Sequence, residues 1–478
     1  IESVHPIEHD SDSDENIEVV IHTETYGCAM NIADTQVIHS LILSEFSSFS
    51  DKITLKFTEN ESEATVFLIN TCAIREKAEI KVIQRLKYLN TLRNRRLSTD
   101  PPQIICVLGC MAEHMKKELL DPSPLSQLFT KTTKKTTNSN QNHRLADIVL
   151  GPDSYRALPF AILNALCYRD SFSSSYNVQL STEETYADVA PVRKLHSKDG
   201  DVSAFVNVMR GCDNACTFCV VPRTRGRERS RPMDSIVSEV QQLSHEGFKE
   251  VVLLGQNVNS YNDLSVSAEQ NSMNERKVIK YSSEGFSSRY GQKDAGKTFA
   301  ELLWKVSEID DEMRIRFTSP HPKDYPMELI EVMNSRNNLC KQVHVPLQSG
   351  STLVLDRMKR GYSREVYIEL VESLREQIPN VALSTDIICG FCGETEKEFE
   401  ETIELMKKVQ FEQAFLYAYS ERDGTPAAKF LIDDVNEDVK QKRLSRMIEV
   451  FHECARTKNE IEEIGRNHLV LIDGEASK

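Results

Sequence analysis

Short apolar runs that suit buried strands alternate with helical patterns along most of this chain, and they fall into two series. In the first series the strand-like runs are residues 17–25, 65–69 and 104–108, each followed by a helical pattern. Such alternation favours a parallel sheet that is covered by helices on its faces. We therefore predict an α/β domain with a doubly wound parallel sheet over residues 17–165.

The second series begins near Ala204, and amphipathic stretches separate its strands. Its strand-like runs are residues 204–208, 250–254, 314–317, 341–345, 382–388 and 412–418. Six strand–helix units predict an open (β/α)6 barrel over residues 196–460, a partial version of the TIM-type barrel. Active sites of such barrels lie at the C-terminal ends of the strands.

Polar segments interrupt both predicted domains. Residues 121–144 and 262–297 are predicted to be loop insertions, because their side chains cannot bury enough apolar surface to fold alone. Residues 166–195 are predicted to link the domains, and the acidic residues 1–16 to form a disordered tail. The chain opens without a methionine and stops soon after a new apolar run. We therefore expect both natural ends, and any targeting signal, to lie outside it.

Composition excludes several classes of protein. No run approaches the roughly 18 consecutive apolar residues of a membrane helix, so we expect a soluble protein without a membrane partner. A net charge of -15 has the wrong sign for coating nucleic acid through bulk electrostatics, so any RNA contact must use local basic patches. Twelve cysteines without a signal peptide favour metal binding or chemistry over a disulfide framework.

A cysteine triplet, Cys212, Cys216 and Cys219, follows a predicted strand with the spacing C-x3-C-x2-C. A loop of this kind wraps three thiolates around one face of a 4Fe-4S cube and leaves the fourth iron without a protein ligand. The open iron suits the amino and carboxylate groups of S-adenosylmethionine and can pass an electron to its sulfonium. The alternative is a zinc site, which usually requires four ligands in paired CxxC arrangements.

Three further cysteines, Cys28, Cys72 and Cys110, each come directly after a predicted strand of the N-terminal domain. The ends of parallel strands share one edge of a sheet, so we expect these thiols to converge on a second cluster with one open iron. The alternative is that each is a small buried hydrophobe. That interpretation suits Cys106, Cys167, Cys340 and Cys454.

Together these motifs resemble the radical S-adenosylmethionine methylthiotransferase family over nearly the whole chain. The N-terminal phrases are TYGCAMNIAD at residues 25–34 and NTCAIREKA at 70–78. The barrel phrases are GRERSRP at 226–232, LGQNV at 254–258, TSPH at 318–321, HVPLQSG at 344–350, GFCGET at 390–395 and RDGTPA at 422–427. The chain is most similar to the MiaB-like branch, the tRNA-2-methylthio-N6-isopentenyladenosine synthases, and especially to its eukaryotic mitochondrial members.

The chain departs from that branch at two positions. Cys392 stands where a proline is common, and Arg223 stands where an aromatic residue is common. Cys389 and Cys392 form a C-x2-C pair, for which a third metal site is conceivable. An unpaired thiol in the barrel wall is the simpler interpretation, because only two ligands are present.

The resemblance implies a tRNA methylthiotransferase with two 4Fe-4S clusters. The cluster on the triplet would cleave S-adenosylmethionine to a 5'-deoxyadenosyl radical that removes hydrogen from C2 of N6-isopentenyladenosine next to the anticodon. The second cluster would supply sulfur, and a further S-adenosylmethionine the methyl group. Implied partners are tRNA, a sulfur donor and an electron donor such as a ferredoxin or flavodoxin-type reductase. The implied location is mitochondrial, with the cytoplasm as the alternative, and residues 465–478 would begin a small β-barrel TRAM domain.

Other functions remain open from sequence. Related methylthiotransferases act on threonylcarbamoyladenosine or on an aspartate of a ribosomal protein, and physical reasoning does not separate these substrates. A non-catalytic regulatory protein could also keep the fold and use its polar insertions to dock partners. The intact cysteine triplets argue against that alternative, because a scaffold has no need of ligand sets with an open iron.

Groups at the predicted strand ends are expected to contact S-adenosylmethionine, inside a barrel mouth that the N-terminal domain caps against water. The candidates are Gln256, Asn257, Ser319, His321, Gln348 and Asp386, together with Phe218 from the triplet loop. The alternative for each is a structural polar group that is satisfied by the protein. For His321, between two prolines, this would be packing in a rigid turn.

An arginine run follows the triplet with a period of two: Arg223, Arg225, Arg227, Arg229 and Arg231. If the segment is extended, alternate side chains share one face, and the guanidiniums would line one edge beside the cluster loop. Such an array suits phosphate of RNA or of an anionic ligand. The alternative is a solvated loop that pairs with local acids such as Glu228.

Overall fold

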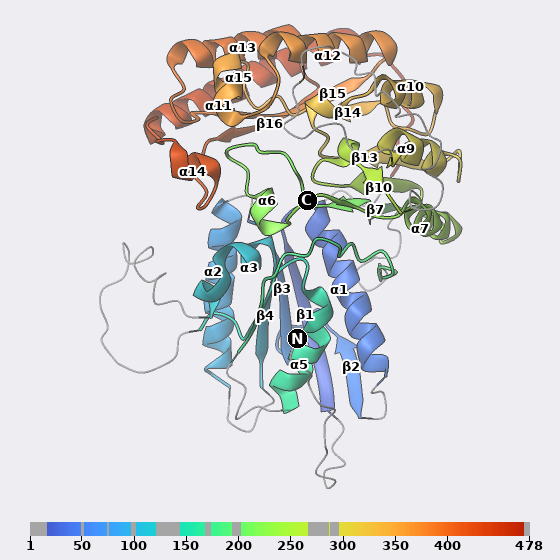
Figure 1. Cartoon of the computed structure of the whole chain (residues 1–478), viewed down its shortest axis with the longest axis vertical. Helices are drawn as coiled ribbons and strands as arrows, with labels where there is room; N and C mark the ends of the chain where they lie inside the picture. The colour runs from blue at the N-terminus through green and yellow to red at the C-terminus, as the bar shows by residue number, and fades with distance from the viewer. Residues whose placement is uncertain are drawn as a thin grey trace.

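The computed structural model describes residues 17–48, 52–73, 76–96, 102–120, 144–167, 174–193, 202–265, 286 and 296–472. They form two α/β domains that follow one another along the longest axis of the molecule (Figure 1). The predicted acidic tail and most of both predicted insertions lie outside the described residues. Within the described part of the chain, no helix is long and apolar enough to cross a membrane.

The N-terminal domain is built on a 6-stranded sheet with the order β2-β1-β3-β4-β5-β6, and every neighbouring pair is parallel. The strands are β1 (Ile17–Tyr26), β2 (Ile53–Phe57), β3 (Val66–Thr71), β4 (Ile104–Gly109), β5 (Ile148–Leu150) and β6 (Ser175–Asn177). The predicted doubly wound parallel sheet is therefore confirmed. β6 lies within the segment predicted to be a linker, so that part of the prediction is wrong.

Helices cover both faces of this sheet. α1 (Ala29–Ser47) and α5 (Leu158–Cys167) pack on one face, whereas α2 (Glu76–Arg93) and α3 (Cys110–Met115) pack on the other, and each face has its own apolar core. β3 and β4 are buried at every position because both faces are covered, which explains their nearly continuous apolar sequences.

The second domain is the predicted six-stranded open barrel. Its strands are β7 (Ser203–Asn207), β10 (Glu250–Leu254), β13 (Arg314–Phe317), β14 (Gln342–His344), β15 (Ala382–Cys389) and β16 (Gln413–Ala418). They form two 3-stranded parallel sheets, β13-β10-β7 and β14-β15-β16, and a parallel bridge between Ile315 and Leu339 links the two. The covering helices are α7 (Met233–His245), α9 (Phe299–Ser307), α10 (Met327–Ser335), α12 (Arg364–Gln377), α13 (Glu396–Val409) and α15 (Glu437–Glu462).

The two domains meet where α1 begins. Met30 and Ala33 of α1 pack against Val252 and Leu254 of β10. These strand residues alternate with Val251 and Leu253, which belong to the core beneath the barrel helices, so α1 contacts the opposite, inner face of the strand. The N-terminal domain therefore covers this side of the barrel interior, as the cap prediction required.

Two peripheral segments lie where the sequence predicts an insertion and the start of a further domain. Short strands β11 (Asn262–Asp263) and β12 (Lys297–Thr298) pair antiparallel at the two ends of the second predicted insertion. After α15, residues 465–472 contain no strand or helix, and Leu469 is 92% exposed. That this segment begins a β-barrel domain stays a prediction.

Candidate functional site

The cysteine triplet lies in a loop between two short strands that pair antiparallel, β8 (Met209–Arg210) and β9 (Arg229–Ser230). Gly211 starts the loop with a φ of 76°, and a Cβ there would lie 2.0 Å from the carbonyl oxygen of Arg227. Only glycine fits this backbone crossing. The backbone N–H of Cys212 donates to the carbonyl of Gly226 at 3.2 Å, which closes the loop at its base.

Each sulfur of the triplet accepts a hydrogen bond from its surroundings. The donors are the backbone N–H of Asn214 to Cys212 at 3.4 Å, the backbone N–H of Val221 to Cys219 at 3.5 Å, and Nη1 of Arg360 to Cys216 at 3.2 Å. Burial raises the pKa of Cys219 to about 12, so its thiolate is unfavourable unless a metal replaces the proton. Sulfurs surrounded by donors suit metal-bound thiolates, so the triplet fits a cluster.

The N-terminal cysteines lie at the carboxyl ends of three neighbouring strands, as predicted. Cys28 follows β1, Cys72 follows β3, and Cys110 follows β4 and begins α3. A hydrogen bond with Cys72 lowers the pKa of Cys28 to about 6. A Cβ on Gly27 would lie 2.7 Å from the Cβ of Cys72, which shows how tightly the two turns meet.

Two buried amides lock these turns together. Asn31 Oδ1 accepts from the backbone N–H of Cys28 at 3.3 Å, and its Nδ2 donates to the carbonyl of Thr71 at 3.0 Å. Asn70 Nδ2 donates to the backbone carbonyl of Asn31 at 2.9 Å. In the described part of the chain, no three His, Cys, Asp or Glu side chains gather as ligands of a single metal ion. A cube instead spreads its thiolates over different irons, and cysteines at three adjacent strand ends suit that arrangement.

The arginine run does not form the exposed face that its spacing predicts. α6 (Val221–Thr224) interrupts the segment, which is extended only at β9, so the predicted single face of five guanidiniums is wrong. Arg225, Arg229 and Arg231 point inward and pair with acids, and their side chains are 4%, 4% and 6% exposed. Exposed members of the run are Arg223 and Arg227, and Arg227 Nε pairs with Asp213 at 2.8 Å.

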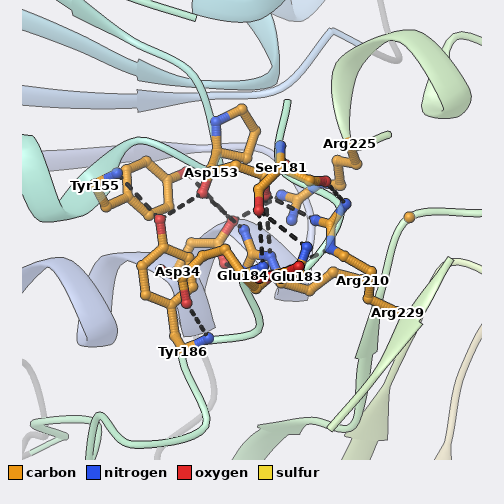
Figure 2. Close-up of polar contacts among 12 residues, drawn as sticks. Asp34, Asp153, Tyr155, Ser181, Glu183, Glu184, Tyr186, Arg210, Arg225 and Arg229 are labelled. Atoms are coloured by element: carbon orange, nitrogen blue, oxygen red, sulfur yellow. Dashed lines mark hydrogen bonds and ion pairs between the residues drawn. The ribbon is translucent and has the colours of Figure 1, made fainter. Parts of the chain in front are cut away.

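A buried ionic network joins the domains beside both cysteine groups, and Figure 2 shows its members converging from both sides of the interface. Asp34 of α1 accepts from Arg210 Nη1 and from Arg225 Nη2, both at 2.8 Å, on its two different oxygens. Arg229 Nη2 donates to Asp153 at 2.8 Å. Arg210 also stacks over the ring of Tyr186, with its guanidinium carbon 4.9 Å from the centroid.

Arg225 connects the two cysteine groups directly. It follows α6 on the loop of the triplet, and its Nε donates to Cys110 Sγ at 3.1 Å. α6 also contacts α3, which begins with Cys110. The loop that carries the triplet therefore lies against the turn that carries Cys110, across the domain interface.

The structure divides the predicted strand-end residues into two groups. Asn257 Nδ2 donates to Asp324 at 2.9 Å and its Oδ1 accepts from the backbone of His321 at 3.1 Å, so protein groups use both ends of this amide. His321 is buried, burial lowers its pKa, and its Nδ1 accepts from the backbone N–H of Lys323 at 3.3 Å. For these two residues the contacts match the structural alternative.

Other predicted residues remain candidates for ligand contact. Ser319 and Gln348, just beyond β13 and β14, have positive φ angles of 59° and 70°. Residues other than glycine in this conformation concentrate at functional sites. Gln256 Oε1 accepts from the backbone N–H of Gly211 at 2.5 Å, which ties β10 to the triplet loop. Asp386 pairs with His344 at 3.2 Å.

Several residues of the site were not predicted from the sequence. They are Asp34, Arg210, His344 and Arg360. Phe218, which was predicted, packs edge-on against Phe391 with ring centroids 6.5 Å apart. Arg360 lies in a segment with no periodic or motif signal, so nothing local could have indicated its contact with Cys216.

Comparison with known proteins gives matches over both domains. Residues 206–406 match the radical SAM superfamily, and residues 20–130 match a family described as uncharacterized protein family UPF0004. The chain is 46% identical to mitochondrial tRNA methylthiotransferase CDK5RAP1 of Mus musculus, over 95% of this chain and 70% of that protein. It is 42% identical to tRNA-2-methylthio-N(6)-dimethylallyladenosine synthase of Chloroherpeton thalassium, over 96% of this chain and 86% of that protein.

Solved structures with a similar fold include the radical S-adenosylmethionine methyltransferase TsrM from Kitasatospora setae, with tryptophan substrate and a SAM analog bound. That match has a TM-score of 0.49 and 12% sequence identity, and it covers 84% of this chain and 73% of that one.

Proposed function

The chain belongs to the radical SAM tRNA methylthiotransferases, and from this membership we propose that its substrate is an N6-isopentenyl (dimethylallyl) adenosine next to the anticodon. The product would carry a methylthio group at C2 of that adenine. Support for this base comes from the 42% identity with a synthase named for the same modified adenosine. The observation that carries the proposal is the pair of cysteine triads, of which the loop that holds one reaches the other through the contact of Arg225 with Cys110.

Each triad has a separate role in this proposal. Cys212, Cys216 and Cys219 hold a 4Fe-4S cluster that binds S-adenosylmethionine, and Cys28, Cys72 and Cys110 hold a second cluster. When bound, the first cluster would supply an electron for the cleavage of S-adenosylmethionine, and the second would supply an iron site for sulfur.

The side chains of the chain orient these groups and exclude water. Arg360 holds Cys216, and Gln256 fixes the base of the triplet loop. Ser319 and Gln348, at neighbouring strand ends, are the proposed contacts for S-adenosylmethionine. α1 covers the inner face of β10, which would exclude water from this side of the barrel interior.

The proposal also includes partners and a location. An electron donor of the ferredoxin or flavodoxin type would reduce the clusters, and a separate donor would replace the sulfur used in each turnover. The mitochondrion is the proposed location, because relatives at 45–46% identity are named as mitochondrial enzymes.

The test is anaerobic reconstitution followed by nucleoside mass spectrometry of tRNA that carries isopentenyladenosine. With reductant, sulfide and S-adenosylmethionine, the expected product is the 2-methylthio derivative, formed by enzyme with about eight irons per chain. Parallel reactions with tRNA that carries threonylcarbamoyladenosine provide the rival substrate. Product only from that tRNA would reject the proposed base.

Variants of the second triad test its role. Cys28→Ala, Cys72→Ala and Cys110→Ala together should leave about four irons and 5'-deoxyadenosine formation, but no methylthio product. Iron content equal to that of the parent protein would show that these cysteines hold no cluster.

A further inference from the structure

We propose that Arg225 and Asp34 form a positioning pair that orients Cys110 and raises the reduction potential of the second cluster. The inference rests on the proposed function, because it assumes that Cys28, Cys72 and Cys110 bind that cluster. It adds a specific means by which the loop of the first cluster acts on the second.

The position and contacts of the Arg225 guanidinium support this role. The residue belongs to the barrel domain, yet its guanidinium is buried in the N-terminal domain, where Nε lies 3.1 Å from Cys110 Sγ. Asp34 fixes the other side of the guanidinium through Nη2 at 2.8 Å. Because the second oxygen of Asp34 binds Arg210 at 2.8 Å, the carboxylate itself has little freedom to turn.

An unsatisfied donor indicates what the guanidinium faces. Nη1 of Arg225 is buried and has no hydrogen-bond partner among the described residues. Arg193 and Arg231 also leave a buried Nε without a partner in the described part of the chain, but the open donor of Arg225 lies on the guanidinium that contacts a cysteine sulfur. A buried donor without a partner is unfavourable, so a group that accepts from it there would be stabilised. An anionic sulfide of a cluster on Cys110 would satisfy it.

Arg360 provides a useful contrast at the first triad. Its Nη1 contacts Cys216, but its Nε donates to Tyr362 and its Nη2 donates to the carbonyl of Pro346. All of its nitrogens therefore have protein partners. Arg225 differs because one of its nitrogens remains available beside the sulfur ligand.

Hydrogen bonds to cluster sulfurs and nearby positive charge both stabilise the reduced, more negative state of an iron–sulfur cluster. Arg225 supplies both from a fixed position. Removal of its charge should therefore shift the potential of the second cluster to more negative values. An Arg that only held the domains together would not change the potential of the cluster selectively.

Arg229 is the matched control for a purely structural role. Like Arg225 it is 4% exposed and donates at 2.8 Å to an aspartate of the N-terminal domain, here Asp153. Within the described part of the chain, its hydrogen bonds go to Asp153 and to backbone carbonyls, and none goes to a cysteine.

The experiment uses the full chain with Cys212→Ala, Cys216→Ala and Cys219→Ala, so that only the second cluster can assemble. Into this parent we would introduce Arg225→Gln, Arg225→Lys or Arg229→Gln. After anaerobic reconstitution, iron per chain and the midpoint potential from an EPR-monitored titration are measured. The expected result is a more negative potential for Arg225→Gln, partial recovery for Arg225→Lys, and the parent potential for Arg229→Gln.

The outcomes distinguish a failure of the proposed function from a failure of the inference about Arg225. A parent without iron overturns the proposed function. With iron in the parent, an unchanged potential in Arg225→Gln overturns the inference, as does an equal change in Arg229→Gln. Loss of iron in Arg225→Gln but not in Arg229→Gln supports the pair, because it shows that Cys110 requires Arg225 for its position.

Discussion

Replacement of Asp34 by asparagine should strongly destabilise the joined domains. The carboxylate is fully buried, and its two oxygens each accept from a different guanidinium at 2.8 Å, with Arg210 1% and Arg225 4% exposed. The asparagine side chain would be isosteric, but it would carry no charge and could accept through only one atom. Removal of one partner from a buried ionic group typically costs about 3–5 kcal/mol, because the remaining charges stay buried without compensation.

The assay is urea unfolding of the metal-free protein, monitored by circular dichroism. The free energy of unfolding of a chain of this size falls by about 3 kcal/mol per molar urea. The loss should therefore lower the urea concentration at the midpoint of unfolding by on the order of 1 M. Glu63→Gln is the control, because Glu63 pairs with Lys56 on the surface at 3.4 Å and exposed pairs contribute little. Equal midpoints for Asp34→Asn and the parent protein would refute the reasoning.

The dependence on pH follows from the same contacts. Burial favours the protonated acid, but the charges of Arg210 and Arg225 outweigh burial and lower the pKa of Asp34 below its ordinary value. A carboxylate with a lowered pKa stabilises the fold above the pKa of the unfolded chain, about 3.9, and this contribution is lost as the pH falls through the lower folded value. The difference between Asp34→Asn and the parent should therefore persist at pH 5 and shrink only in stronger acid.

Three further predictions concern other residues of the site. Gly211→Ala should remove the first cluster and leave about four irons by iron assay, because a Cβ would lie 2.0 Å from the carbonyl oxygen of Arg227; full iron content would contradict this. Arg360→Gln should slow formation of 5'-deoxyadenosine, measured by chromatography, because Cys216 loses its charged donor, whereas Arg364→Gln on the nearby surface should not. Glu113→Gln should raise the urea midpoint at pH 8 more than at pH 5. Burial raises the pKa of Glu113 to about 7, so its ionised form destabilises the fold as the pH rises above the ordinary value; an equal change at both pH values would refute this.

Sequence patterns predicted the elements that carry the cysteines and missed three shorter strands of the N-terminal sheet, β2, β5 and β6. β3 and β4 are buried along their whole length, so their apolar runs were unmistakable. β2 alternates between half-buried and exposed positions at the sheet edge, and β6 has only the polar sequence Ser-Tyr-Asn. β6 exists because β5 offers free hydrogen-bonding groups, which periodicity does not record. In β2, by contrast, Ile53, Leu55 and Phe57 alternate with polar residues and pack against the core, a pattern typical of a half-buried strand.

The arginine run shows a different limit. A period of two has meaning only for an extended backbone, and Pro222 at the start of α6 instead favours a helical turn there. The acids that draw the side chains inward lie far away in sequence, with Arg225 and Asp34 191 positions apart. The positions of the cysteines could be inferred because each cysteine or cysteine loop follows a predicted strand. The ionic contacts between the domains could be seen only in the three-dimensional structure.

The interlocked arginines and aspartates also restrict how this architecture can be recombined. A chimera that takes its sheet domain from one relative and its barrel from another must keep Asp34 and Asp153 matched to Arg210, Arg225 and Arg229. A mismatch would leave an unpaired buried charge at the domain interface, next to both sets of thiols. Exchange of parts between such enzymes should therefore succeed only when both sides of the junction are transferred as a set.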